Sequence, residues 1–183
     1  GSDTNLEADT PDKNYGGKSI LTLKQGTSLP VLQFDLSLIP VGSRIIEAKL
    51  LLYRQDPGSF TLSARTVNAH RVLEPWLAGS KNGSSAADGA TWLTRDGSVA
   101  WKSASGTVDS ANATDTPHIH YYIWGTPWME WNLTSLVQGW VDRRYPNYGV
   151  MLRPTTSVST EEYTAAEGDS AQVPKLAIKY VAP

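Results

Sequence analysis

Apolar and polar residues alternate along several short stretches of the chain, and this period of two is typical of β-strands. The longest alternation covers residues 44–53, where we expect Glu47 and Lys49 to face solvent. The residues expected to face inward there are Ile46, Ala48, Leu50 and Leu52. A second alternation covers residues 31–36 and places on one face Leu32, Phe34 and Leu36. One polar face per strand indicates antiparallel sheets.

Further segments have the composition of strands. They cover residues 19–24, 61–72, 161–163 and 174–180, and in the last of them the side chains expected to face inward are Leu176, Ile178 and Tyr180. Repeated strands without intervening helices favour a sandwich. The polar run SGTVDSANATDTP at residues 105–117 has too little apolar content to pack, so we expect a surface loop there.

The period changes after residue 132. The apolar positions now fall at i, i+3, i+4, i+7 and i+8, and they are Leu133, Leu136, Val137, Trp140 and Val141. This spacing predicts one short amphipathic helix near residues 134–142, between strands at 129–132 and 148–152. We expect Thr134 to be its N-cap, and Arg143 and Arg144 to complement the negative end of the helix dipole.

The length and composition indicate one domain. At 183 residues the chain can enclose a full core, and the absence of cysteine means that no disulfide framework supports it. We predict an all-β domain over residues 3–183, an antiparallel, jelly-roll-like β-sandwich with one short α-helix. Gly1 and Ser2 read as a cloning scar.

Residues 128–153, WMEWNLTSLVQGWVDRRYPNYGVMLR, resemble the central signature of the DNRLRE-domain family, whose relatives include the alginate-binding carbohydrate-binding module family 96. Matching motifs occur in the same order at residues 12–16, 34–40, 48–53 and 174–180. The chain departs from the family in two ways: residues 94–127 look inserted, and the charged motif that names the family is not recognisable. The resemblance implies a secreted or cell-surface module that binds a polysaccharide, beside other domains of one polypeptide.

Charge and composition narrow the class of partner. The net charge of −2 argues against nucleic acid, and no apolar run is long enough to cross a membrane. Seven Trp and eight Tyr stand against two Phe, and such amphipathic rings suit carbohydrate or protein surfaces. We expect a monomer whose partner is a polysaccharide.

Residues 7–17 contain the best candidate for a metal site. Asp9, Asp12 and Asn14 offer hard oxygen ligands spaced as at the start of a calcium loop, which would make calcium a structural cofactor. The alternative is a solvated turn held by its own Asx side chains, and we favour that alternative.

The end of the inserted segment contains a histidine-rich strand. On a strand, His118, His120 and Tyr122 would share one face. A His-x-His pair can hold a transition metal only with a third ligand, and His70 is the one other histidine in the chain. We therefore favour solvated or hydrogen-bonded histidines.

Aromatic residues outside the expected core define a candidate ligand surface. We assign Trp76, Trp92, Trp131 and Trp140 to core or rim packing. The candidate ligand-binding residues are Trp101, His118, His120, Tyr121, Tyr122, Trp124, Trp128, Arg143, Arg144 and Tyr145. Sugar rings stack on such aromatic faces, and the two arginines could pair with uronate carboxylates. Equally, those arginines could only stabilise the helix end.

Two other functions compete with glycan binding. No motif for a known nucleophile or phosphate loop is present. Glu130 with Glu161 could hydrolyse a glycoside, and the histidine–tyrosine strand could serve a polysaccharide lyase, but both glutamates lie in patterns typical of solvated strand faces. We predict a non-catalytic binding module. A structural spacer of a surface protein would need no pocket at all.

Overall fold

The computed structural model describes residues 1–55, 66–85, 87–113, 127–155 and 160–183. Strands make up 42% of the chain and helix 5%, and the strands pair in antiparallel sheets. The predicted all-β sandwich with one short helix is therefore confirmed.

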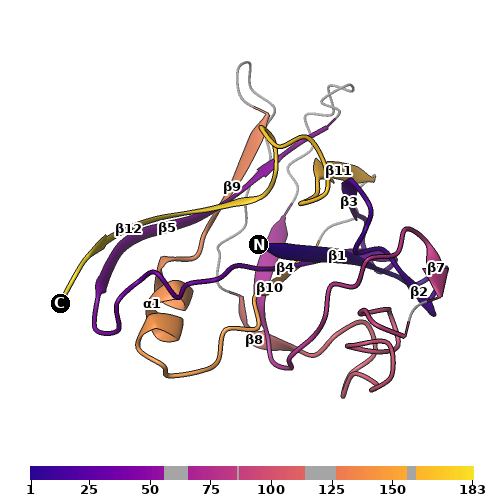
Figure 1. The fold of residues 1–183 in the computed structure, drawn as a ribbon, viewed down its shortest axis with the longest axis horizontal. Helices are drawn as coiled ribbons and strands as arrows, with labels where there is room; N and C mark the ends of the chain where they lie inside the picture. Colours follow the sequence, from indigo (N-terminus) through magenta and orange to yellow (C-terminus); the bar gives the residue numbers. More distant parts are fainter. Residues whose placement is uncertain (56–65, 86, 114–126, 156–159) are drawn as a thin grey trace.

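A five-stranded antiparallel sheet, here called the main sheet, forms the centre of the molecule. In spatial order its strands are β1 (Ser2–Glu7), β4 (Ser28–Gln33), β10 (Val150–Pro154), β6 (Val67–Val72) and β8 (Val108–Ala113). Segments distant in the sequence thus lie side by side (Figure 1). The prediction of a surface loop is wrong for residues 108–113, because β8 pairs with β6 at the edge of this sheet.

Smaller sheets surround the main sheet. Their strands are β12 (Lys175–Val181), β5 (Arg44–Tyr53) and β9 (Trp128–Asn132) in one sheet, β11 (Glu161–Thr164) with β3 (Ile20–Leu23) in another, and β2 (Lys13–Asn14) with β7 (Ser84–Ser85) in the last. In Figure 1, β12 and β5 run together along one side, with the helix α1 (Thr134–Val141) beside them. The strands expected at residues 19–24 and 161–163 are both present.

The main sheet separates two hydrophobic clusters, because side chains alternate between its faces. Along β10, Val150 and Leu152 belong to the larger cluster, which also contains residues of α1 and of the smaller sheets. Met151, between them, belongs to the second cluster. The segment after β6 closes this second cluster and contributes Trp76, Ala90 and Trp101. The core thus has one layer on each face of the main sheet.

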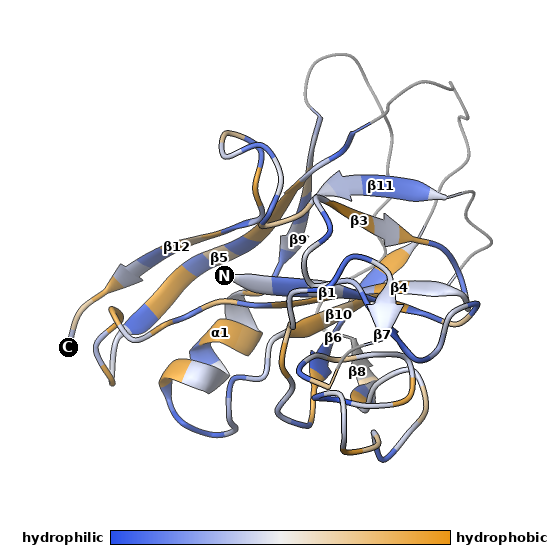
Figure 2. Cartoon of the chain, turned by 45° about the vertical axis from the view of Figure 1, so that its right-hand side comes forward, coloured by the Kyte–Doolittle hydropathy of each residue, from blue (hydrophilic) through white to orange (hydrophobic). Residues whose placement is uncertain are grey.

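Strand β5 carries an irregularity that shifts its pattern. Ala48, Leu50 and Leu52 are fully buried, as predicted, and Figure 2 shows the alternating hydropathy along the strand. Towards its start the prediction is wrong, since Ile45 is 7% exposed and Ile46 is 37% exposed. The register shifts here, because Lys179 pairs with Glu47 and the next residue of β12 pairs with Ile45. This β-bulge turns Ile46 outward.

The same bulge changes the end of β12. Leu176 and Ile178 pack against the larger cluster, as expected. Tyr180 is 40% exposed, so its predicted inward orientation is wrong. The extra residue of the bulge is Ile46 of β5, so Tyr180 pairs with Ile45 in place of Ile46, while no residue is inserted in β12 itself.

The helix α1 follows β9 and hydrogen bonds to the same edge of β5 with which β9 pairs. Beyond Asn132, the last residue of β9, the hydroxyl of Thr134 accepts a hydrogen bond from the backbone N–H of Ala48, at 3.0 Å. Gln138 accepts another from the N–H of Ile45, at 2.8 Å. Polar side chains of α1 therefore satisfy edge groups of β5 while Val137 and Trp140 enter the larger cluster.

Both ends of α1 differ from the prediction. Thr134 is not the N-cap; that position is Leu133, and the side chain of Asn132 accepts the N–H of Thr134 at 3.0 Å. At the other end, no basic residue lies in the last turn. Arg143 has a φ of 56°, and the N–H groups of Arg143 and Arg144 bond back to carbonyls of the last turn. This Schellman arrangement, not the charge of the arginines, ends the helix.

Candidate functional site

A cleft of about 250 Å³ opens beside the second cluster, at one end of the main sheet. We call it the Arg153 cleft. The residues that line it are Gly26, Leu29, Trp92, Ser105, Arg153 and Pro154. They come from the β3–β4 turn, from β4 and β10, and from the long segment that covers the second cluster, so four parts of the chain meet here.

Arg153 is the charged group of this cleft. Its Nη2 atom donates hydrogen bonds to the backbone oxygens of Ser105 and Gly106, at 3.3 and 3.1 Å, and its Nε lies 3.3 Å from the sulfur of Met151. No carboxylate in the described part of the chain pairs with it. Burial lowers the pKa of the guanidinium. A half-buried cation without a counter-ion is costly, so it favours an anion from solution or from a ligand.

Trp92 stands in a tight turn that other groups hold in place. The hydroxyl of Thr91 accepts hydrogen bonds from the N–H groups of Leu93 and Thr94, at 3.2 and 3.0 Å. The carbonyl of Thr91 accepts the indole N–H of Trp101 at 3.0 Å. The Trp92 carbonyl accepts the N–H of Ser105, at 3.1 Å. The half-buried Trp92 ring is thereby presented to the cleft from a fixed backbone.

The wall below Arg153 uses unusual backbone. Ser105 has a φ of 64° and Gly106 a φ of 91°, both in the left-handed region. The φ of Gly106 is strained for any residue with a Cβ, and a Cβ there would also push against the terminal methyl of Met151. This conformation directs two consecutive carbonyls at the guanidinium and fixes its orientation.

These groups suit one kind of chemistry. Nη2 and Nε of Arg153 already donate to the chain, so the two hydrogens on Nη1 are left to donate charge-assisted hydrogen bonds to a carboxylate or sulfate. An indole face stacks on the apolar face of a sugar ring. The combination of the two in one open cleft can hold an acidic sugar, and the residues that line the cleft include no carboxylate, histidine or tyrosine.

The structure describes only half of the ten predicted ligand residues. His118, His120, Tyr121, Tyr122 and Trp124 lie outside the described residues. The assignment of Trp101 to the ligand surface is wrong. Its ring is 5% exposed within the second cluster, and its indole N–H is already bonded.

Trp128 and Tyr145 are described, and each has a cation over its ring. Lys175 Nζ lies 4.4 Å from the centroid of the Trp128 ring, and Tyr53 contacts the same ring edge to face at 5.3 Å. The guanidinium of Arg71 lies 4.2 Å from the Tyr145 ring. Trp128 begins β9, whereas Tyr145 follows α1.

Arg143 and Arg144 follow α1 and are exposed. Arg144 pairs with Asp142 at 2.9 Å, so its charge is already balanced by a neighbour. Arg143 forms no ion pair with any residue that the structure describes. Binding of an acidic glycan by these arginines stays a prediction.

The predicted calcium ligands do not form one oxygen cage. Asn14 is fully buried, and its side chain has four hydrogen bonds, to Gly16 N, Lys81 N and the carbonyls of Ala78 and Ala90. Both its donors and its acceptor are thus used, so Asn14 does not fit a metal ligand. It instead fastens the segment at residues 78–90 to β2.

Asp9 and Asp12, the two carboxylates of the predicted calcium site, are exposed. Asp12 accepts a hydrogen bond from the hydroxyl of Ser85 at 2.9 Å and lies 3.7 Å from Lys13. Among the described residues, no group of three or more histidine, aspartate or glutamate side chains is placed to hold a metal. Calcium at Asp9 and Asp12 stays a prediction without Asn14.

The two glutamates of the hydrolase alternative lie in different environments. Glu161 is 2% exposed, and Tyr163 donates a hydrogen bond of 2.6 Å to it, so the expectation of a solvated Glu161 is wrong. Glu130 is exposed and pairs with Lys49 at 3.2 Å.

The sequence reasoning missed Arg153 and placed Trp92 in core or rim packing. Two signals were available: Arg153 ends a strand whose preceding residues are apolar, and Trp92 follows a turn-rich, polar stretch. Neither signal indicates that the two residues meet.

Comparisons with known proteins do not assign the chain to a family, because no family model and no curated protein matches it. The resemblance to the DNRLRE-domain family therefore stays a prediction. Within the described part of the chain, no helix has the length and apolar character needed to cross a membrane.

Proposed function

We propose that this domain is a non-catalytic carbohydrate-binding module that binds an acidic polysaccharide in the Arg153 cleft. The observation that carries the proposal is a half-buried guanidinium without a carboxylate partner, beside the ring of Trp92. A uronate would supply the missing negative charge, and its ring would stack on the indole. The secreted or cell-surface location, beside other domains, rests on the family resemblance alone.

The site geometry supports binding more than catalysis. The cleft contains one cation and one aromatic ring but no carboxylate, histidine or tyrosine. Such a site can orient a sugar, and it lacks the carboxylate and imidazole groups that most often transfer protons in enzymes. The ligand is thus expected to leave unchanged.

Titration calorimetry with a polyuronate and a neutral glucan would test this proposal. Arg153→Gln removes the charge and should weaken polyuronate binding by at least about tenfold, or 1.4 kcal/mol. Trp92→Ala should weaken it by a similar factor. Binding should also fade as salt is raised, because the attraction is between charges.

Arg144→Gln is the matched control. It makes the same change of charge at an exposed arginine that is already paired with Asp142, so its effect should be less than about twofold. If the Arg143→Gln, Arg144→Gln double variant loses binding while Arg153→Gln keeps it, the glycan binds beside α1 instead. If no polysaccharide binds the intact chain, the spacer alternative is correct. Shortening of the glycan during incubation would contradict the non-catalytic assignment.

A further inference from the structure

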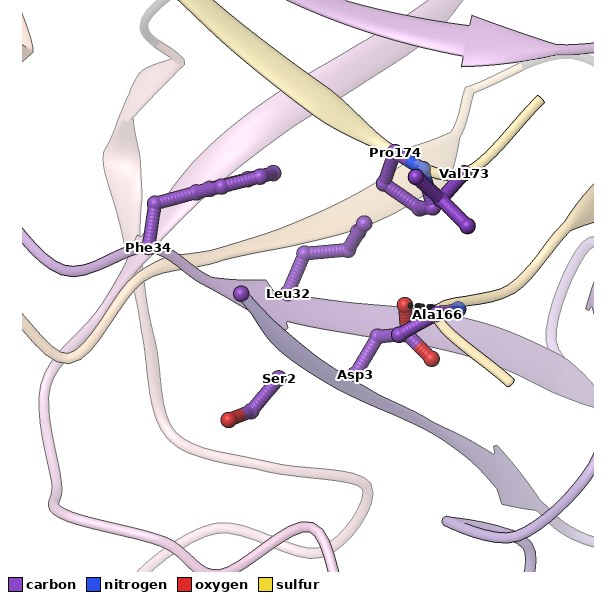
Figure 3. Close-up of a pocket in the computed structure, with 8 residues that line it drawn as sticks. Ser2, Asp3, Leu32, Phe34, Ala166, Val173 and Pro174 are labelled. Carbon is purple, nitrogen blue, oxygen red and sulfur yellow. Dashed lines mark hydrogen bonds between the residues drawn. The ribbon is translucent and has the colours of Figure 1, made fainter. Parts of the chain in front are cut away.

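A second pocket lies on the opposite face of the main sheet, where the larger cluster reaches the surface. It has a volume of about 170 Å³, and Figure 3 shows the side chains that surround it. Asp3 of β1 forms its one acidic group, and the other lining residues are Gly1, Ser2, Leu32, Phe34, Ala166, Val173 and Pro174. We call it the Asp3 pocket. Its walls are mostly apolar, and an acid lies at their base.

The carboxyl of Asp3 is only half satisfied. The side chain is 3% exposed, and its Oδ2 atom accepts a hydrogen bond from the N–H of Ala166 at 2.9 Å (Figure 3). Its other oxygen accepts no hydrogen bond from any described residue. This oxygen is not one of the fully buried polar atoms that lack a partner, so it can be reached from the pocket, where a donor from solution or from a ligand can bond to it.

The charge balance around Asp3 is negative. Burial raises the pKa of Asp3 to about 7; the Ala166 N–H lowers it, the Glu167 carboxylate raises it, and the Gly1 amine lowers it by the smallest amount. No lysine or arginine side chain lines the pocket. The terminal amine of Gly1, whose residue lines the pocket, has the smallest of the four effects on Asp3, so an entering cation would meet an acid that no described side chain neutralises.

A neighbouring hollow extends this surface past Phe34. It has a volume of about 400 Å³, shares Gly1, Ser2 and Phe34 with the Asp3 pocket, and contains the exposed carboxylate of Asp35. No basic side chain lines it either. The two hollows together have an acidic character, whereas the Arg153 cleft is cationic.

We propose that the Asp3 pocket binds a primary ammonium group carried on an apolar body, from a small amine or from a lysine side chain. The ammonium would donate a charge-assisted hydrogen bond to the free oxygen of Asp3. The ring of Phe34 attracts a cation over its face, and Leu32, Val173 and Pro174 would contact the apolar body. The volume is close to that of a cavity of about 150 Å³ that holds benzene, so a benzyl or butyl group fits. This inference does not depend on the proposed glycan site.

Chemical-shift titration of the full chain with benzylamine tests the proposal, and benzyl alcohol is the neutral control of equal shape. Near pH 8 benzylamine should shift the amide of Ala166 and should bind at least about tenfold more tightly than benzyl alcohol. Near pH 5, where Asp3 is protonated, this preference should fall to about twofold or less. Equal binding of the two compounds at both pH values would overturn the proposal.

Two variants separate the contribution of the Asp3 charge from that of the Phe34 ring. Asp3→Asn keeps an oxygen for the Ala166 N–H but removes the charge, so it should weaken benzylamine at least about tenfold and leave benzyl alcohol within about twofold. If that variant does not fold, Phe34→Leu replaces it, and the loss of the ring should weaken benzylamine by about threefold or more. Unchanged binding in the folded variants would refute the site.

A third ligand distinguishes the two sources of the ammonium. Nα-acetyl-lysine methylamide carries a lysine side chain without a terminal charge. Binding as tight as that of benzylamine, lost in Asp3→Asn, would identify a partner protein's lysine as the ligand. Binding of benzylamine alone would identify a small amine, and binding of neither would overturn the proposal.

Discussion

The Arg153 cleft and the Asp3 pocket lie on opposite faces of the main sheet, and strand β4 contributes to both. Leu29 lines the cleft and belongs to the second cluster, whereas Leu32 lines the pocket and belongs to the larger cluster. An odd separation along a strand places two side chains on opposite faces. A single strand thus provides the floor for a cationic site on one face and for an acidic site on the other.

The comparison also shows how each charge is held. Arg153 is fixed by two carbonyls, and Asp3 by one backbone N–H. In both sites the backbone orients the charged group but does not neutralise it. Burying a charge without a partner costs stability, so neither group is explained by folding alone. Perturbed ionisable groups in hollows are typical of functional sites.

The largest effect is expected at Trp101, whose buried ring supports the Arg153 cleft from within the second cluster. Trp101→Ala should lower the free energy of unfolding by about 3–5 kcal/mol, because it empties a large part of the second cluster. The substitution also removes the hydrogen bond that holds the turn of Trp92. Urea unfolding would measure the loss of stability, and polyuronate titration would measure the loss of binding in the cleft.

The Asp3 pocket is the internal control for this variant. It is built on the other face of the main sheet, so benzylamine should still bind a folded Trp101→Ala protein within about twofold of the wild-type affinity. If the variant loses binding of both the polyuronate and benzylamine, the two faces of the main sheet are not independent.

The next effect concerns the pH dependence of stability. The pKa of Asp3 is raised in the folded protein from 3.8 to about 7, so the folded state keeps a proton that the unfolded state has lost. Stability from this group is therefore present below about pH 4, falls as the pH rises to about 7, and is fully lost above that value. Asp3→Asn should remove this fall and stabilise the protein near pH 8 by on the order of 3 kcal/mol.

Thermal and urea unfolding of both proteins between about pH 4 and pH 8 would measure this difference. Glu7 is a second group whose pKa is raised by burial, so some decline with pH should remain in the variant. Parallel stability curves for the two proteins would show that Asp3 titrates normally. The acidic pocket would then lack the desolvated carboxyl that distinguishes it from the cleft.

Local patterns in the sequence were sufficient for the main elements. The alternation at residues 48–52 and the apolar stripe from Leu133 to Val141 each follow from the geometry of a strand or a helix. The errors arose where a tertiary contact overrides the pattern. The bulge opposite Lys179 reverses the orientation of Ile46, and the pairing of β8 depends on a partner strand more than thirty residues away in the chain.

The candidate sites were less predictable for a related reason. Trp92, Arg153 and Ser105 meet only because β10 is inserted between β4 and β6, and no spacing in the sequence encodes that order. In the sequence Asp3 looks like an ordinary acidic residue near the terminus, whereas in the structure the segment after β11 covers it. Trp101 looked available because a polar run surrounds it, yet its ring fills the second cluster. Burial of individual polar and aromatic residues is thus set by topology.

The smallest effect is expected at Arg143, which follows α1 and forms no ion pair with a described residue, and it contrasts with Arg153. Arg143 is exposed, and its φ of 56° is unfavourable for a residue with a Cβ. Arg143→Gly should therefore stabilise the protein by about 1 kcal/mol, since glycine is the usual residue at this position of a Schellman motif. Arg144→Gly, at the next residue, is the matched control and should give no such gain. Urea unfolding would measure both changes, and polyuronate titration would compare their binding with that of Arg153→Gln.

A destabilised Arg143→Gly protein would show that the arginine makes a contact worth more than its backbone strain. A stabilised protein that has lost the glycan would mean that the strain is retained for binding, and the glycan site would then lie at the helix end instead of in the Arg153 cleft.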